Sequence, residues 1–202
     1  MRPGKFKSNS GFSLIELMSA TALTLVTAFA FYTVFLTIRN ELAQQDNYYT
    51  GNRTIRFALD KMARDGEEAI GVVSNWAGDT TGNSILILKL PSVNASGVPT
   101  NIASQFDYVT YKLSGTTLTR TLDLLDGTSQ REGGDDIINR RVATQVQSLL
   151  FTSGGTALGS IAAATLPTLK TINAQILAQA AIRGRTQTSQ GDADLMLRNN
   201  VS

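Results

Sequence analysis

The sequence predicts an α+β fold in which one long N-terminal helix, with a membrane half and an amphipathic half, packs on an antiparallel β-sheet. Three observations lead to this fold class. A run of 22 uncharged, mostly apolar residues lies near the N-terminus, an apolar stripe with helical spacing follows it, and beyond Gly71 the apolar residues recur with the spacing of strands. The expected segments are a short basic stretch at 1–11, a membrane helix at 12–38, its amphipathic continuation at 39–70 and a β-sheet domain at 71–202.

The composition excludes several kinds of active site. The chain has 202 residues, of which 42% are hydrophobic and 17% charged, as in a folded protein. It contains no cysteine and no histidine, which excludes disulfides, thiol catalysis, Ser-His-Asp triads and His-ligated zinc. Paired carboxylates, phosphate-binding glycine loops and Ser-Lys dyads do not stand out either. We therefore expect a protein that is not an enzyme, with no catalytic residues, no metal and no cofactor.

The net charge of +2 is concentrated at the N-terminus. Arg2, Lys5 and Lys7 occur in the first eleven residues without an acid, leaving 15 basic and 16 acidic side chains in the other 191 residues. The body of the protein therefore has no basic excess, and nucleic acid is not expected as a partner.

The membrane half of the helix follows this basic stretch. Residues 17–38 carry no charge and would form a helix of roughly 33 Å, which matches a hydrocarbon core of about 30 Å. Positive charge before the run places the N-terminus in the cytoplasm and the bulk of the chain outside it. An alternative interpretation of this segment is a signal peptide that is cleaved after the small-x-small residues 28–30, which would release a protein starting at Phe31. The apolar run continues past that site without a polar break, which favours the anchor.

Glu16 is the unusual residue of this segment. A carboxylate at the start of an apolar run costs up to a few kcal/mol, so it is a candidate functional residue. The alternative is that it lies solvated among the lipid headgroups and is inert.

The residues around Glu16 favour the functional interpretation. The stretch from Lys7 to Leu17 reads KSNSGFSLIEL, and it resembles the leader and cleavage site of type IV prepilins and type II secretion pseudopilins. The resemblance implies that residues 1–11 are a prepilin leader, that a dedicated inner-membrane prepilin peptidase cuts after Gly11, and that Phe12 is then N-methylated. It also implies a pilin-like fold. Phe12 and Glu16 share a helix face, so in a filament we expect Glu16 to form an assembly salt bridge with the N-terminal amine of a neighbouring subunit.

Looser patterns at 58–65, 111–120 and 197–199 resemble the minor pilins and pseudopilins of the PilW and GspJ type. This implies a minor pilin of a type IV pilus, first a single-pass inner-membrane protein and then part of a periplasmic and cell-surface filament, in a tip or initiation complex. The implied partners are the prepilin peptidase, the inner-membrane assembly platform, and other minor and major pilins or pseudopilins bound through the N-terminal helix. The chain lacks the disulfide-bounded loop and the helix-kinking proline of many major pilins.

Three alternatives to this function stay open. The first is a minor pseudopilin of a type II secretion system, and the second is a tip adhesin or DNA-uptake pilin. The third is a membrane-anchored enzyme, which would need a concave pocket with convergent carboxylates or Lys-Ser pairs.

The amphipathic half of the helix, 39–70, contains no proline, and Gly51 and the neighbouring residues 47–49 are the places where it could loosen. Its apolar stripe recurs at spacings of four, three, four and four: Ile55, Leu59, Met62, Gly66 and Ile70. Basic residues lie mostly off the stripe and alternate with acids, which indicates a solvated face: Arg53, Arg56, Lys61 and Arg64, with Asp60, Asp65, Glu67 and Glu68.

The sheet domain begins with a buried strand at 84–90, ended by Pro91, and a β-hairpin at 106–122 that turns at Ser114-Gly115. Apolar residues between Val142 and Phe151 indicate a further element whose type stays open. A strict two-residue alternation predicts a strand at 172–182, and 194–199 is expected to be the terminal strand. The stretches 153–164 and 184–194 are expected to be loops.

Two further features could bind ligands. The glycine-rich stretch from Asp126 to Asp136 holds four carboxylates and could bind calcium, although its spacing is not that of an EF-hand and a solvated acidic loop is the better interpretation. Trp76 could be a surface aromatic for a ligand, but we expect it to pack where the helix meets the sheet.

Overall fold

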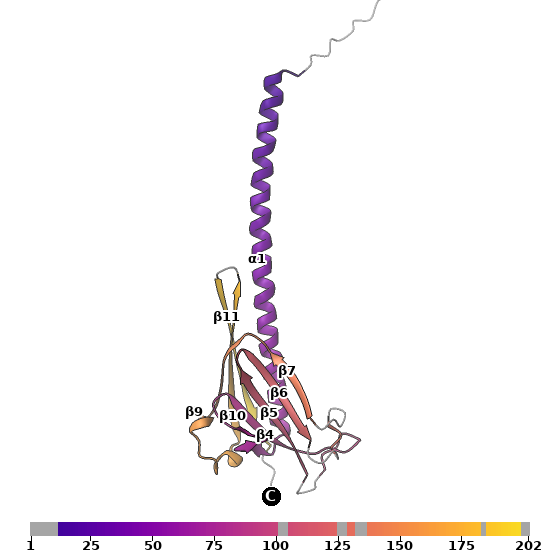
Figure 1. Cartoon of the computed structure of the whole chain (residues 1–202), viewed down its shortest axis with the longest axis vertical. Coiled ribbons are helices and arrows are strands. Elements are labelled where there is room, and N and C mark those ends of the chain that lie inside the picture. The colour runs from indigo at the N-terminus through magenta and orange to yellow at the C-terminus, as the bar shows by residue number, and fades with distance from the viewer. Residues whose placement is uncertain (1–11, 101–104, 125–128, 132–136, 183–184, 199–202) are drawn as a thin grey trace, which may run out of the picture. The chain divides into compact units, whose positions relative to one another are not determined.

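The computed structural model describes residues 12–100, 105–124, 129–131, 137–182 and 185–198 (Figure 1). The chain divides into two compact units, Met1–Asp46 and Asn47–Ser202, and each is described by itself. Helix α1, Leu14–Glu68, is continuous through Gly51 and ends two residues before the expected boundary at Ile70.

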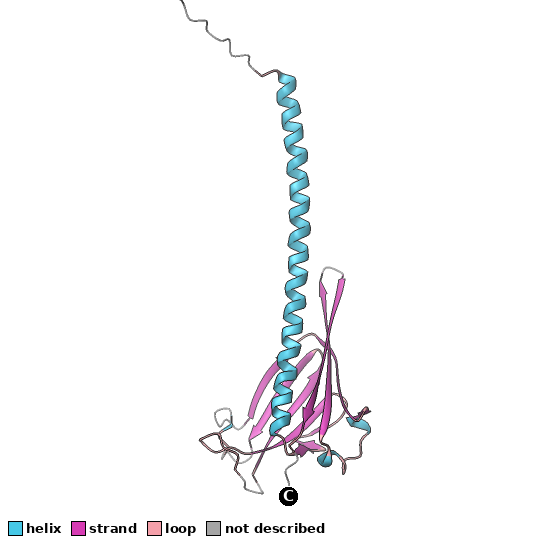
Figure 2. Cartoon of the chain, turned by 180° about the vertical axis from the view of Figure 1, so that it is seen from behind, coloured by secondary structure: helices cyan, strands magenta, loops and turns pink. Residues whose placement is uncertain are grey.

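Unit 47–202 contains the C-terminal part of α1 and two main antiparallel sheets, where the sequence predicted one sheet (Figure 2). The first sheet has the order β1-β4-β5-β6-β7, with strands Gly71–Val72, Ile85–Pro91, Phe106–Ser114, Thr117–Leu124 and Ile137–Ala143. The second has the order β11-β10-β8-β9, with strands Arg185–Met196, Thr171–Ile182, Val146–Ser153 and Thr156–Ala157. A small hairpin pairs β2, Asn75–Trp76, with β3, Asp79–Thr80, and two short 3-10 helices are η3, Leu158–Ser160, and η4, Leu166–Thr168.

The α+β class is confirmed, and the core lies between α1 and the two sheets. Ile55, Leu59 and Met62 are each 5% exposed or less, as the helical stripe predicts. They join one apolar cluster with residues of both sheets, including Leu86, Val109, Leu122, Phe151 and Ile176. Burying this stripe is what holds the amphipathic part of α1 in a helix.

Several predicted strands are confirmed. β4 includes Pro91 as its last residue, and β5 pairs with β6 in the expected hairpin, with Ser114 opposite Thr117. Gly115 has a φ of +59°, which glycine adopts without a steric penalty. In β10 every second residue is buried from Ile172 through Ala178, which is the predicted alternation.

The prediction of a loop at 184–194 is wrong, because β11 begins at Arg185 and pairs with β10 along twelve residues. The terminal strand is therefore much longer than expected. Before Leu195, the face of β11 that meets α1 carries the small residues Ser189, Gly191 and Ala193, so no alternation of large apolar residues marks it. A Cβ added to Gly191 would lie 2.8 Å from Ile55 Cγ2, which shows how closely the strand approaches the helix.

The open element between Val142 and Phe151 is two strands. β7 belongs to the first sheet and β8 to the second, and Thr144 and Gln145 connect them. The expected loop at 153–164 also holds the short strand β9 and the 3-10 helix η3. Gly154 and Gly155 both have positive φ, which makes the tight turn between β8 and β9.

Candidate functional site

The candidate site is the first turn of α1, where two of the three residues predicted from the sequence are described. Gly11 lies outside the described residues, as does the whole stretch 1–11. Phe12 precedes the helix and is 89% exposed, and Glu16 lies in the first helical turn and is exposed. Phe12 and Glu16 are thus both accessible at the start of the helix.

The side chains of Ser13 and Glu16 both cap the helix N-terminus. The backbone N–H of Ser13 donates to Glu16 Oε2 at 3.0 Å, and the N–H of Ile15 donates to Ser13 Oγ at 3.2 Å. This is a variant of the capping box in which the hydroxyl accepts from the second and not the third helical residue, and it satisfies N–H groups that have no partner within a helix. A serine followed three residues later by glutamate before an apolar run is its sequence signature, and our sequence analysis overlooked it. Glu16 therefore has a structural role within its own chain.

Among the described residues, α1 is the one helix with a segment long and apolar enough to cross a membrane, and none of that segment is buried. Large apolar side chains along it are more than half exposed, among them Leu17, Leu23, Phe29, Phe35 and Ile38. A continuous exposed apolar surface of this extent marks a lipid or protein contact.

The serine and threonine hydroxyl groups in this segment are satisfied within the helix. Each of the following donates to a backbone carbonyl three or four residues earlier, at 2.7–3.0 Å: Ser19, Thr21, Thr24, Thr27, Thr33 and Thr37. Polar groups that are paired internally do not need water, so these residues are compatible with an apolar environment.

At the other end of α1, a buried ion pair joins the helix to the first sheet. Asp65 Oδ2 accepts from Arg120 Nε at 2.6 Å and Oδ1 from Arg120 Nη2 at 3.2 Å, while the hydroxyl of Tyr111 donates to Oδ2 at 2.6 Å. Both charged side chains are at most 5% exposed. Burial, and then the charge of Asp65, raise the pKa of Tyr111 well above its ordinary value, so this phenol stays protonated as a donor. The expectation that Asp65 lies on a solvated helix face is therefore wrong.

A second polar cluster fixes residues 129–131 against the sheet. Asp107, which is fully buried, accepts from Ser92 Oγ at 3.1 Å, from Ser129 Oγ at 2.7 Å and from Arg131 Nε at 3.0 Å. Arg131 also donates to Glu68 at the end of α1 and to the carbonyl of Pro91 at 2.8 Å. These contacts are structural, because every polar group named here is occupied by another part of the chain.

The other candidates from the sequence have no binding geometry in the described part of the chain. The carboxylates of the proposed calcium loop, Asp126, Glu132, Asp135 and Asp136, lie outside the described residues. The described ranges contain no group of three or more His, Cys, Asp or Glu residues that could hold a metal ion. Of the basic helix residues, Arg53, Arg56 and Arg64 are exposed, as predicted for a solvated face.

Trp76 is a packing residue, but not where the sequence analysis placed it. Its ring stacks on Tyr108 of β5 with centroids 3.5 Å apart, and its Nε1 donates to Asp123 Oδ2 at 2.7 Å. Along β5, Val109 and Tyr111 share the strand face that joins the core with α1, and Tyr108 lies on the other face. Trp76 therefore covers the face of the first sheet that is turned away from α1. Burial and the nearby Asp123 carboxylate raise the pKa of Tyr108.

A comparison with models of known protein families gave no match, and a comparison with curated protein sequences gave none either.

Proposed function

We propose that this protein is a membrane-anchored assembly subunit, a minor pilin of a type IV pilus, that is cut after Gly11, N-methylated on Phe12 and built into a filament through α1. The observation that carries the proposal is the position of the prepilin-like motif. Phe12 and Glu16 stand at the start of a helix whose apolar surface is exposed over a membrane-spanning length.

The helix surface suits a subunit that first resides in the membrane and is then built into a filament. An apolar face with internally satisfied hydroxyls is stable in lipid, which suits residence in the inner membrane before assembly. The same face can pack against the helices of other subunits, because interhelical contacts replace lipid contacts at little cost. The proposed partners are accordingly other pilins along the helix, besides the peptidase and the inner-membrane assembly platform, and the proposed final location is the periplasmic and cell-surface filament.

Glu16 is the proposed polar contact between subunits. After cleavage, the amine of Phe12 is a new positive charge beside an apolar helix, and burying it in a filament requires a carboxylate partner. Glu16 is exposed and supplies that charge at the same level of the helix. Pairing with the amine of a neighbouring subunit would set the axial stagger between the two helices.

The first experiment tests the processing step. Gly11→Val should leave an uncut precursor that is heavier by the mass of residues 1–11, because a Cβ at the position before the cut would obstruct a tight peptidase site. Intact-mass spectrometry of the membrane fraction distinguishes the two forms. Normal trimming of Gly11→Val, or a native N-terminus at Phe31, would refute the assignment.

The second experiment separates the charge of Glu16 from its capping role. Glu16→Gln keeps a capping-box side chain but removes the charge, whereas Ser13→Ala removes the hydroxyl cap and keeps the charge. We expect both Glu16→Gln and Glu16→Ala to be inserted and cleaved but to be lost from sheared filaments, while Ser13→Ala co-purifies with them. The identity of the co-purifying pilins distinguishes a pilus from a type II secretion pseudopilus. If Glu16→Gln enters filaments as the parent does, Glu16 acts only as a cap.

A further inference from the structure

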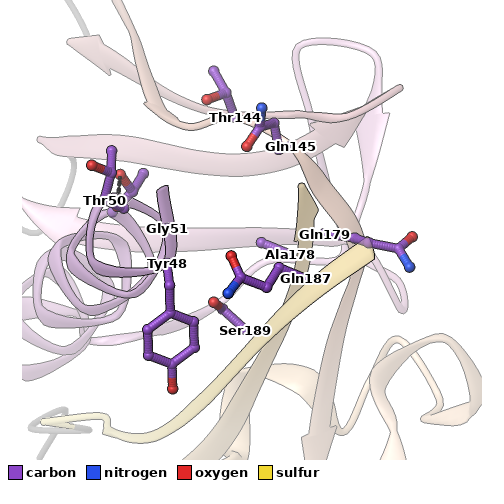
Figure 3. Close-up of a pocket in the computed structure, with 10 residues that line it drawn as sticks. Tyr48, Thr50, Gly51, Thr144, Gln145, Ala178, Gln179, Gln187 and Ser189 are labelled. Atoms are coloured by element: carbon purple, nitrogen blue, oxygen red, sulfur yellow. Dashed lines mark hydrogen bonds between the residues drawn. The ribbon is translucent and has the colours of Figure 1, made fainter. Parts of the chain in front are cut away.

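A polar cavity of about 180 Å³ opens within unit 47–202, between α1, the β7–β8 turn and the β10–β11 ribbon (Figure 3). Its lining includes Tyr48 and Thr50 of α1, Gln145 of the turn, and Gln187 and Ser189 of β11. None of the lining residues is an acid or a base of the Asp, Glu, Lys or Arg type. The cavity therefore offers amide and hydroxyl groups without a fixed charge.

Gln187 supplies the first sign that the cavity receives a ligand. Its Oε1 is buried, and among the described residues no donor reaches it. A buried amide oxygen without a donor is costly, so such an atom calls for an explanation. In Figure 3 the amide of Gln187 points toward the α1 side of the cavity, whereas the side chain of Gln179 points away from it. A ligand O–H or N–H in the cavity would supply the missing donor.

The backbone of Gln145 is a second and independent sign. Its φ of +61° is a left-handed conformation that is uncommon for a residue with a side chain, and glycine is its usual occupant. The turn is held in place, since the carbonyl of Gln145 accepts from the N–H of Gln179 at 2.9 Å. Backbone outliers of this kind cluster at ligand sites. Here the unusual conformation puts an amide side chain, and not a glycine, at the cavity wall.

Tyr48 gives the lining its apolar component. The side chain is 43% exposed, so part of its ring is open to an incoming molecule. Tyrosine combines an apolar ring with a polar hydroxyl, which suits a ligand that is apolar on one face and hydroxylated at its rim. A volume near 180 Å³ is less than that of the cavities of about 300–1,000 Å³ that enclose drug-sized ligands, so any ligand is small.

We propose that this cavity binds one sugar unit of a neutral carbohydrate. A pyranose presents hydroxyl groups around its rim and C–H groups on its face, which matches amide and hydroxyl side chains next to one aromatic ring. One sugar hydroxyl donates to Gln187 Oε1, and the ring lies against Tyr48. A charged sugar is disfavoured, because the lining has no counter-charge for it.

The test uses the full chain in dodecylphosphocholine micelles, a detergent without a sugar headgroup. Saturation-transfer NMR is run with the methyl glycosides of glucose, galactose, mannose and N-acetylglucosamine, and with glucuronate and glucosamine as charged counterparts. At least one neutral glycoside should receive saturation above the level seen with empty micelles, and glucuronate and glucosamine should both receive less than it does. If no neutral glycoside responds, the proposal is refuted.

Two matched pairs of variants locate the binding. Gln187→Leu should weaken the responding sugar by about three- to tenfold, whereas Gln179→Leu should leave it unchanged. Tyr48→Ala should lose binding, whereas Tyr49→Ala, at the adjacent residue that does not line the cavity, should not. Because Gln187→Leu removes an unpartnered oxygen, its melting temperature should equal or exceed that of the parent, so the loss of binding is not a loss of folding.

The rival occupant is a side chain of a neighbouring subunit. The chain has no cysteine, so Gln187→Cys creates a unique thiol for a benzophenone crosslinker. If the crosslinker captures another pilin at this position in filaments and no sugar gives a signal, the occupant of the cavity is a neighbouring protein. That result would overturn the proposal. Equal effects of Gln187→Leu and Gln179→Leu on sugar binding would overturn it as well.

Discussion

Asp65→Leu should destabilise unit 47–202 by about 3–5 kcal/mol, because it leaves the guanidinium of Arg120 buried without its carboxylate. The side chain of Arg120 is 2% exposed, and the substitution also removes the acceptor of the Tyr111 hydroxyl. Arg120→Met should cost less, since Asp65 keeps the Tyr111 hydroxyl and has the Lys61 ammonium 3.8 Å away. For a domain of this size, the Asp65→Leu cost corresponds to a fall in melting temperature of roughly 6–20 °C.

The informative variant is the triple substitution Asp65→Leu, Tyr111→Phe and Arg120→Met. It removes these three buried polar side chains at once and replaces each with an apolar side chain of similar size. Buried ion pairs can be exchanged for apolar residues with little loss, so the triple variant should lie within about 1 kcal/mol of the parent. Stabilities of the single and triple variants should therefore be strongly non-additive.

The assay is urea unfolding of the full chain in micelles, followed by tryptophan fluorescence. Trp76 is the one tryptophan of the chain and packs on Tyr108, so its emission reports on unit 47–202 and not on the apolar part of α1. The surface pair of Lys112 and Asp79, 2.5 Å apart with side chains 43% and 28% exposed, is the matched control, and Asp79→Asn should cost less than about 1 kcal/mol. If Asp65→Leu costs no more than Asp79→Asn, or if the triple variant is as unstable as the single costs added together, the reasoning about the buried pair is wrong.

Three further predictions use the same fluorescence. A fragment starting at Arg39 should be soluble and folded, with the circular dichroism of a mixed α/β protein. In this fragment Leu59→Asp buries an unpaired charge and should cost several kcal/mol, whereas Phe57→Asp should cost little because Phe57 is 61% exposed. Equal melting temperatures of Leu59→Asp and the parent would show that the helix does not pack on the sheets. The folded-state pKa of Tyr111 is raised, so the stability that the protonated phenol contributes is complete below a pH of about 10 and is lost as the pH rises from there. Urea unfolding midpoints from pH 8 to 12 should therefore fall less steeply for Tyr111→Phe than for the parent, and identical slopes would contradict this. Gly191→Ala should cost about 1–3 kcal/mol, because its Cβ would lie 3.0 Å or less from Ile55 Cγ2 and Leu59 Cδ1; an unchanged urea midpoint would show that the β11–α1 contact is loose.

The sequence predicted those parts of the fold in which large apolar side chains recur with the spacing of a helix or a strand. The stripe through Ile55, Leu59 and Met62 and the alternation in β10 are both buried as expected. β11 was not predictable in the same way, because it approaches α1 through Ser189 and Gly191. Small residues permit a close helix–strand contact, but they carry the composition of a loop.

The change of sheet between β7 and β8 had no signal in the sequence. The connection is two residues long, and its left-handed position is occupied by Gln145, where a glycine would have marked a turn. The pairing of Asp65 with Arg120 was unpredictable for a different reason. The two residues are 55 positions apart, and they meet only because the register of β5 and β6 places Arg120 opposite Tyr111.

The candidate site at the start of α1 was predictable as a motif but incompletely as geometry. Glu16 was identified from its cost in an apolar run, and its hydrogen bond to Ser13 adds a role that this cost does not imply. The two roles are compatible. An ionised carboxylate has two oxygens with about four acceptor sites, and the cap uses Oε2 for one backbone N–H. The exposed side chain can thus hold the helix end in shape and still accept an amine from outside the subunit. In the proposed assembly, a cap that fixes the carboxylate beforehand would also lower the entropy lost on pairing with a neighbour, since the side chain is already ordered. The donor of this hydrogen bond is the backbone N–H of Ser13, so Ser13→Ala should keep the ordering of the carboxylate.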